Sequence, residues 1–349
     1  MLFWLGHLLE PYFGPFRLLK SHLFLGGLSV MLCFFLTILL LPRMAHLTSR
    51  DRGRAHAVQG EAAKGKPTGT GVIFISIFVG VQFLCLPLTW QSFLILVLTQ
   101  GAMLFGYLDD RALIPWSEYK KGALDLVLAA AGTAVLSGLA PVPMWLPFFK
   151  ASLIVPLWLF MLGGTGLIWI AINATNCTDG VDGLSGTLSA IAFTALGTLM
   201  YFILGHQQIA QYLLLPHAAD GAVWGMIAFA VVGTLMAYLW FNAHPSQLLM
   251  GDAGSRAIGF LLGVFVIKTG NPVMILVVTA VLLLNGGTGL VKVALLRFAR
   301  IAILRSVRFP LHDHVRHNWH WSNPQVLVRF SVLQVMLTMV LLLLLIKIR

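Results

Sequence analysis

Apolar residues form ten long runs along this chain, and short polar stretches separate them. A helix needs about 20 mostly apolar residues to cross the hydrocarbon core of a bilayer. The ten runs have roughly that length and are predicted to be membrane-spanning helices near 22–42, 70–88, 91–108, 122–140, 152–172, 185–205, 222–241, 256–270, 273–296 and 326–348. We therefore expect an all-α integral membrane protein with about ten transmembrane helices, organised as a single polytopic domain over residues 1–349.

The first 20 residues differ from the runs that follow. They mix aromatic side chains with Arg17 and Lys20, a composition typical of segments that lie in the membrane interface. The first apolar run has no small-residue cleavage site after it, so we expect it to be retained as a span.

Lys and Arg are distributed unevenly between the two predicted sides of the membrane. Ten spans place five loops on one side, near residues 43–69, 109–121, 173–184, 242–255 and 297–325. These loops hold 14 Lys and Arg residues, whereas the opposite loops and the two termini hold six. Because cytoplasmic loops carry the excess of positive residues, we expect the five loops to be cytoplasmic.

Composition excludes a soluble protein. Hydrophobic residues make up 58% of the chain and charged residues 10%, against about 25% charged residues in soluble domains. The net charge of +11 fits cytoplasmic loops facing anionic lipid headgroups, and no nucleic-acid-binding module is recognisable, so no nucleic-acid partner is expected. Three cysteines do not indicate a disulfide framework.

Aspartates gather in the predicted cytoplasmic loops. Five of the nine lie in three of these loops: Asp109, Asp110, Asp179, Asp182 and Asp252. Carboxylates at a membrane boundary are costly unless they face water, a partner or an ion. One such residue could be an ordinary solvated loop residue, but five on one face indicate a shared site. Mg²⁺ suits that site, because it needs only one or two carboxylates besides substrate phosphates.

Several lysines are candidate partners for phosphate groups. Lys64 and Lys66 lie in KGKPTGTG (64–71), and Lys121 follows the first aspartate pair; alternatively, these residues only set the topology. Lys292 lies inside the ninth run and must either reach the interface or find a partner. Asp125 is four residues after Lys121, so an i,i+4 ion pair accounts for it.

The segment PLHDHVRHNWH (310–320) is rich in histidine. His312 and His314 flank Asp313, and three interpretations are open: a zinc site, a solvated loop, or imidazoles that hold a diphosphate and a sugar. A carboxylate between the two rings favours their protonated, cationic forms.

Four motifs occur in a fixed order on these loops: LDD (108–110), NATNCTDGVDGLSG (173–186), FNAHPSQLLMGDAGS (241–255) and PLHDH (310–314). Together they resemble the polyprenyl-phosphate N-acetylhexosamine-1-phosphate transferases, over about residues 43–330. The similarity is greatest to the members that transfer phospho-N-acetylmuramoyl-pentapeptide.

The resemblance implies a ten-helix, homodimeric, Mg²⁺-dependent enzyme of the bacterial inner membrane, with its active site on the cytoplasmic side. Its substrates would be UDP-N-acetylmuramoyl-pentapeptide and undecaprenyl phosphate, with UMP released. By similarity Asp109, Asp110 and Asp252 match the catalytic aspartates, with Asp252 and Asp110 next to the metal. The predicted substrate-binding residues are Lys64, Lys66, Lys121, Asn176, Asp179, Asp182, Asn242, His312 and His314. The residues allow either direct attack by the lipid phosphate or prior attack by an aspartate.

The chain departs from the family pattern at four positions. Asp313 stands where the family has the middle of three histidines, Ala63 where a lysine is expected, and Leu249 where a phenylalanine is common; Lys292 falls near an expected glutamine. These changes leave open a related transferase for UDP-N-acetylglucosamine or another UDP-N-acetylhexosamine. A transporter or a non-catalytic nucleotide-sugar-binding paralogue is a further alternative, although a transporter should carry its acids near mid-membrane.

Overall fold

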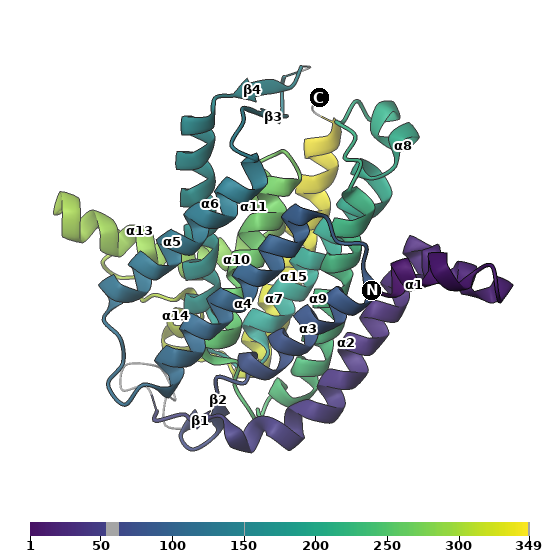
Figure 1. The fold of residues 1–349 in the computed structure, drawn as a ribbon. Helices are drawn as coiled ribbons and strands as arrows, with labels where there is room; N and C mark the ends of the chain where they lie inside the picture. Colours follow the sequence, from purple (N-terminus) through teal and green to yellow (C-terminus); the bar gives the residue numbers. More distant parts are fainter. Residues whose placement is uncertain (54–62, 150, 348–349) are drawn as a thin grey trace.

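In the computed structural model, helices account for nearly every predicted span (Figure 1). The structure describes residues 1–53, 63–149 and 151–347. Part of the predicted loop 43–69, Lys150 of the charge comparison and the end of the last predicted span (residue 348) lie outside the described residues. The helices begin and end as follows: α1 Leu2–Leu9, α2 His22–Met44, α3 Gly71–Cys85, α4 Trp90–Arg111, α5 Glu118–Ser137, α6 Leu157–Thr178, α7 Leu184–Thr198, α8 Gln207–Tyr212, α9 Gly221–Asn242, α10 Gly251–Lys268, α11 Met274–Val278, α12 Ala280–Leu282, α13 Thr288–Ala294, α14 Leu311–Asn318 and α15 Asn323–Lys347.

Irregular helices and two small hairpins complete the described chain. Short 3₁₀ segments are η1 Gly14–Lys20 and η2 Ala45–Leu47, and wider π-type turns are η4 Leu199–Leu204, η5 Leu283–Gly287 and η6 Leu295–Ala299. Two antiparallel pairs join β1 Ser49–Arg50 to β2 Pro67–Thr68, and β3 Val142–Met144 to β4 Leu153–Val155. The two hairpins lie at opposite ends of the bundle (Figure 1).

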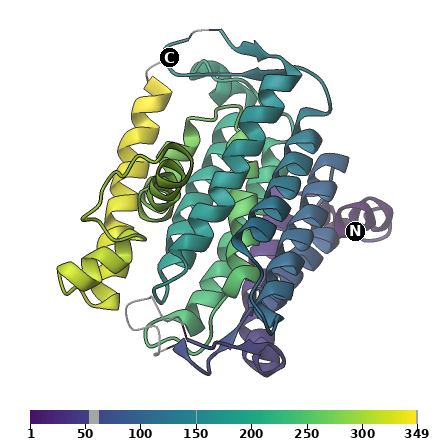
Figure 2. The ribbon, with the colours of Figure 1, turned by 90° about the vertical axis from the view of Figure 1, so that its left-hand side faces the viewer.

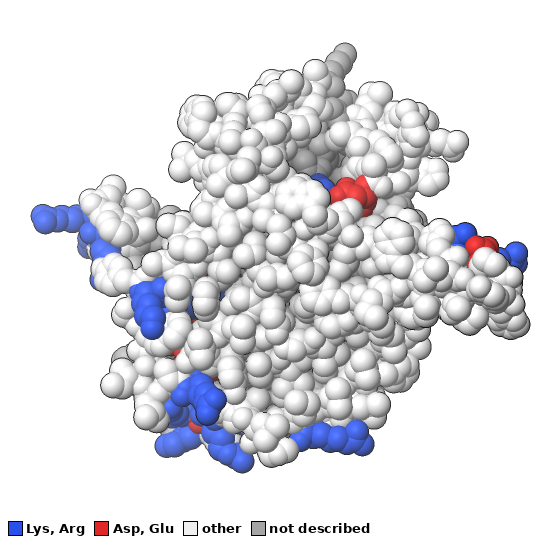
Figure 3. All heavy atoms as spheres, in the orientation of Figure 1, with Lys and Arg blue, Asp and Glu red and all other residues white. Residues whose placement is uncertain are grey.

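The prediction of an all-α membrane protein is confirmed. Within the described residues, seven helical segments are long and apolar enough to cross a membrane. The other three predicted spans are also helical: α3 is short, and α5 and α10 carry several charged residues. The count of ten spans stays a prediction. Figure 3 shows a largely uncharged flank, with Lys and Arg gathered toward the end where β1 and β2 lie.

One predicted span is not a continuous helix. The run 273–296 is interrupted after α11, at Thr279 (φ −123°, ψ 23°), and continues through α12, η5 and α13. The side chain of Gln334 on α15 bonds the backbone at the break, accepting from Val281 N (2.8 Å) and donating to Val278 O (3.0 Å). A polar side chain from a neighbouring helix can satisfy backbone groups freed inside a membrane. Beyond η5, α13 points away from the bundle (Figures 1 and 2).

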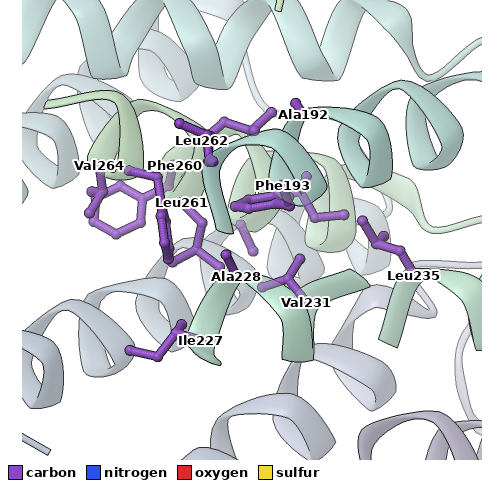
Figure 4. Packing of buried hydrophobic residues seen from close by; sticks show 14 of the residues in the cluster. Ala192, Phe193, Ile227, Ala228, Val231, Leu235, Phe260, Leu261, Leu262 and Val264 are labelled. Atoms are coloured by element: carbon purple, nitrogen blue, oxygen red, sulfur yellow. The ribbon is translucent and has the colours of Figure 1, made fainter. Parts of the chain in front are cut away.

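Helix α10 lies at the centre of the bundle and packs against α3, α4, α5, α6 and α7. Apolar side chains of α7, α9 and α10 interdigitate beside it, including Phe193, Val231 and Phe260 (Figure 4). Gly259 and Gly263 face α6, where an added Cβ would lie 2.6 Å from Ile172 Cα and 2.7 Å from Ile168 Cα. Small residues four apart allow such close helix contact in membranes, and this contact brings the polar ends of α6 and α10 together.

Candidate active site

The paired aspartates at the end of α4 have different partners. Asp109 accepts a hydrogen bond from Trp116 N (2.8 Å) and forms an ion pair with Lys121 Nζ (2.6 Å) at the start of α5. Asp110 instead accepts from the backbone N–H groups of Asp252 (3.1 Å) and Ala253 (3.0 Å). A carboxylate at a helix N-terminus satisfies unpaired N–H groups and the helix dipole. Asp110 therefore attaches the start of α10 to the end of α4.

Asp252, in the first turn of α10, is the centre of the cluster. Its Oδ1 accepts from Asn176 Nδ2 (2.9 Å) at the end of α6, and its Oδ2 lies 3.2 Å from Arg256 Nε and 3.5 Å from Lys121 Nζ. Lys121 thus bridges Asp109 and Asp252, which come from sequence regions more than 140 residues apart.

Arg256 is a site residue that the sequence reasoning missed. It is buried, and besides Asp252 it forms an ion pair with the buried Asp125 of α5. The predicted i,i+4 pair between Lys121 and Asp125 is wrong, because Lys121 turns toward Asp109 and Asp252. The spacing of Arg256, four residues after Asp252 and on the same helix face, was the signal available in the sequence.

The ion pairs line a small cavity bounded by Phe105, Asp109, Trp116, Lys121, Leu124, Asp125 and Arg256. Four carboxylates lie in this cluster with the cations Lys121 and Arg256. The cations pair with Asp109, Asp125 and Asp252, whereas Asp110 is bonded to backbone N–H groups. When all are ionised, the formal charge is −2. A divalent cation would neutralise it, so the donor set fits Mg²⁺, which binds carboxylate oxygens. In the described part of the chain no three acidic, histidine or cysteine side chains converge into a ready-made metal cage, so phosphates and water would complete the coordination.

The loop between α6 and α7 carries the next predicted residues. Asp182 Oδ2 accepts from Ser246 N (3.2 Å) and lies 2.8 Å from His244 Nδ1. Burial alone would raise the pKa of Asp182, but the hydrogen bonds from Ser246 and His244 outweigh it and lower the pKa. Lys66 Nζ donates to Ser246 Oγ (3.0 Å) in the segment between α9 and α10, so the lysine segment before α3 contacts the same serine whose N–H group bonds Asp182.

Asn242, at the end of α9, ties the same loop to the segment that leads into α10. Its Oδ1 accepts from Gly183 N (2.8 Å), and its Nδ2 donates to Leu248 O (2.7 Å). Asp179 caps the end of α6, and Lys64 lies in the exposed turn before β2. The side chain of Asn242 therefore bonds backbone groups of both segments and holds them together.

The two predicted histidines face different surroundings. His312, 2% exposed, lies beside the α6–α7 loop: a Cβ added at Gly180 would be 2.5 Å from its Nε2. His314 Nδ1 accepts from Arg308 N (3.2 Å) instead, and its ring packs against Trp319. The structure thus brings His312 to the loop of Asp179 and Asp182, and His314 to the segment before α14.

Asp313 and Lys292 both have partners. Asp313 accepts from Arg316 NH1 (3.3 Å) on the same helix. Burial lowers the pKa of the Arg316 guanidinium, while the charges of Asp313 and Asp182 oppose that shift. Lys292 Nζ donates to Leu304 O (2.9 Å) and Val307 O (2.8 Å), so it supports the segment that leads to α14.

Comparison with known proteins adds to this geometry. The model of the family described as glycosyl transferase family 4 matches residues 92–270, the region that contains the aspartate cluster. The chain belongs to this family.

Relatives within the family are similar over nearly the whole chain. The phospho-N-acetylmuramoyl-pentapeptide-transferase of Treponema pallidum (strain Nichols) is 52% identical over 344 residues, covering 98% of this chain and 95% of the relative. The protein of the same name from Rhodopseudomonas palustris (strain BisA53) is 29% identical over 287 residues, covering 79% of each chain. The resemblance inferred from four motifs is therefore confirmed for the family.

Proposed function

We propose that this chain transfers phospho-N-acetylmuramoyl-pentapeptide from its UDP donor to undecaprenyl phosphate in peptidoglycan synthesis. The observation that carries the proposal is the buried cluster in which Lys121 bridges Asp109 and Asp252. It lies at the end of the bundle where the donor-binding candidates Asp182 and His312 also lie. The name of the Treponema pallidum relative supports the same reaction.

The reaction is a phosphoryl transfer. An oxygen of the lipid phosphate forms a bond to the phosphorus that carries the sugar, and the bond from that phosphorus to the oxygen of the uridine phosphate breaks, so UMP leaves with the electron pair. Positioning and charge stabilisation contribute most to such transfers. Bound Mg²⁺, held by Asp252 with Asp110 beside it, would supply charge neutralisation for the diphosphate.

We propose direct attack by the lipid phosphate. Every carboxylate oxygen of Asp109, Asp110 and Asp252 already accepts a hydrogen bond or an ion-pair contact. Such contacts lower the nucleophilicity of a carboxylate, and a phosphate monoester is already ionised near neutral pH. The aspartates then orient Lys121 and the cation, and Lys121 contributes positive charge close to the phosphates.

The test uses purified protein with undecaprenyl phosphate and Mg²⁺. UDP-N-acetylmuramoyl-pentapeptide and UDP-N-acetylglucosamine are offered separately, and UMP release is measured. We expect release with the first donor only; release with the second alone would establish the alternative transferase. Excess EDTA should abolish the release and added Mg²⁺ should restore it, whereas full activity in EDTA would remove the metal from the proposal.

Location and assembly belong to the same proposal. The excess of Lys and Arg in the predicted cytoplasmic loops supports a cytoplasmic location for β1 and the site, in a bacterial inner membrane. A cysteine introduced at Ser49 should resist an impermeant thiol reagent in intact cells, and its labelling there would refute the topology.

The homodimer implied by the family predicts twice the protomer mass in light scattering of the detergent-purified protein.

A further inference from the structure

Asn285 is a buried polar residue in the interrupted ninth span that none of the motifs includes. It lies in η5, is 0% exposed, and contacts three groups. Its Oδ1 accepts from the backbone N–H of His312 (2.8 Å), and its Nδ2 lies 3.1 Å from His312 Nδ1 and 3.0 Å from Thr178 Oγ1. One side chain therefore contacts both the backbone and the ring of His312.

The chemistry of these partners determines how the amide is oriented. A backbone N–H can only donate, so the oxygen of the amide must face His312 N and the NH₂ group must face the ring. The Thr178 hydroxyl donates to Ala174 O (2.8 Å), so its oxygen accepts one Nδ2 hydrogen. The second Nδ2 hydrogen is then donated to His312 Nδ1, which must carry a lone pair and no proton.

From this network we infer that Asn285 is a positioning residue that holds His312 as the neutral tautomer with its proton on Nε2. The inference rests on the proposed function, in which the α6–α7 loop binds the UDP-sugar. His312 Nε2 lies against Gly180 of that loop. The ring then presents a hydrogen-bond donor to an oxygen of the donor substrate, such as a diphosphate oxygen.

The charged groups around the ring agree with a neutral imidazole. Asp313 Oδ1 is 3.9 Å from His312 Nε2, too far for a hydrogen bond, and is bonded to Arg316 NH1 at 3.3 Å. The guanidinium of Arg316 satisfies the carboxylate and adds positive charge nearby. The inference therefore differs from the expectation that Asp313 favours a cationic His312, because here Nδ1 accepts from Asn285.

Local helix geometry allows Asn285 to reach both partners. η5 is a π-type turn, and such turns often occur at functional sites. A Cβ on the neighbouring Gly286 would lie 2.4 Å from Ala174 O, so only glycine lets η5 approach α6 this closely. This approach brings Asn285 within hydrogen-bond distance of Thr178, the last residue of α6 before the α6–α7 loop.

Histidine-ring nitrogen NMR of the full-length protein in detergent tests the tautomer directly. The His312 signal is identified as the one missing from His312→Gln. We expect it to show a protonated Nε2 and an unprotonated Nδ1 at pH 7.5. In Asn285→Asp, which is nearly isosteric but cannot donate, Nδ1 should become protonated. The control is Asn271→Asp, a buried asparagine of another segment, which should leave the signal unchanged.

Activity measurements test the role of the Nε2 proton. Gln places an N–H near the position of Nε2, whereas Asn places one nearer Nδ1. His312→Gln should therefore keep kcat/KM for the UDP-sugar about 10- to 100-fold above His312→Asn, the range expected for one hydrogen bond to a charged group. Asn285→Asp should mainly raise KM.

The outcomes separate this inference from the proposed function. If the parent protein releases no UMP from either donor, the proposed function fails, and the NMR spectrum still decides the tautomer. A parent spectrum with Nδ1 protonated, or with both nitrogens protonated, overturns the inference. So does His312→Asn with a kcat/KM equal to or above that of His312→Gln.

Discussion

The two ends of helix α10 carry at least partly buried ion pairs of similar composition, but only one of the two is balanced in charge. At its first turn Asp252 joins Lys121 and Arg256, and at its last turn Lys268 forms an ion pair with Asp220 of the segment before α9 (2.7 Å). The two lysines are about equally buried, with side chains 16% and 17% exposed. Burial alone therefore does not distinguish the two ends.

Charge balance distinguishes them. At the last turn of α10, one carboxylate pairs with one ammonium group. Their other hydrogen bonds are made with neutral groups: Trp224 Nε1 donates to Asp220 (2.9 Å), and Lys268 Nζ donates to Gln91 Oε1 (3.5 Å). At the start of α10, two cations pair with three carboxylates, and a fourth carboxylate, Asp110, lies beside them on backbone N–H groups.

Buried charges are costly unless they are paired, so the difference has a functional meaning. The balanced pair at Lys268 is complete within the protein and serves to hold α9 and α10 together. On the proposed function, the unbalanced cluster at Asp252 would be completed by an external cation and by the phosphates that carry it. Excess like charge in a buried site is thus a better indication of chemistry than a buried ion pair as such.

The largest expected effect comes from removing one carboxylate at each end. Asp252→Asn should lower turnover by roughly 100- to 1000-fold, because the site loses charge that holds the cation. Its affinity for the lipid phosphate should change little. Asp220→Asn should leave turnover within about twofold and lower Tm by roughly 2–4 °C. UMP release and thermal unfolding of both variants measure the contrast; equal turnover in Asp252→Asn would remove that residue from the site.

Removing one cation at each end should give a smaller difference. Lys121→Met should lower turnover by about 10- to 100-fold and also destabilise the protein, because Asp109 and Asp252 lose the ammonium between them. Lys268→Met has similar burial and should reduce only Tm. If Lys268→Met lost as much activity at equal folded protein, the two ends would not differ in function.

Arg256 tests whether charge or geometry matters within the cluster. Arg256→Lys keeps the charge, but a single ammonium cannot reproduce the fork that contacts both Asp125 and Asp252. We expect about tenfold lower turnover with a normal requirement for Mg²⁺. Arg256→Gln should be worse, because Asp125 then remains buried without its cation. Kinetics of Arg256→Lys identical to those of the parent would show that the fork geometry contributes nothing.

The smallest expected effect concerns pH. The folded-state pKa of Asp182 is lowered from its ordinary value of 3.8, so its stabilising contribution is present above that value and is lost as the pH falls through the folded-state pKa. Asp182→Asn should therefore lower Tm at pH 7, and the difference from the parent should shrink only below about pH 4. A difference that already disappears at pH 6 would contradict the lowered pKa.

The sequence by itself determined the helices, the family and the grouping of polar motifs. Apolar runs of membrane length can satisfy their backbone only as helices, so each of the ten predicted runs is largely helical in the structure. Alternation of spans then places the loops of Asp110, Asp182 and Asp252 at one end of the bundle, where the structure has them. That step needs only the order of runs along the chain.

Only the tertiary structure decided which partner each polar group takes. The i,i+4 spacing predicted an ion pair between Lys121 and Asp125. In the structure Asp125 instead pairs with Arg256, which is 131 residues further along the chain. The break at Thr279 and the contact of Asn285 with His312 also depend on helices distant in sequence, through Gln334 and Thr178. Helix periodicity specifies which residues share a face, whereas the choice of partner depends on which faces meet at close range, and that is set by the packing of the whole bundle.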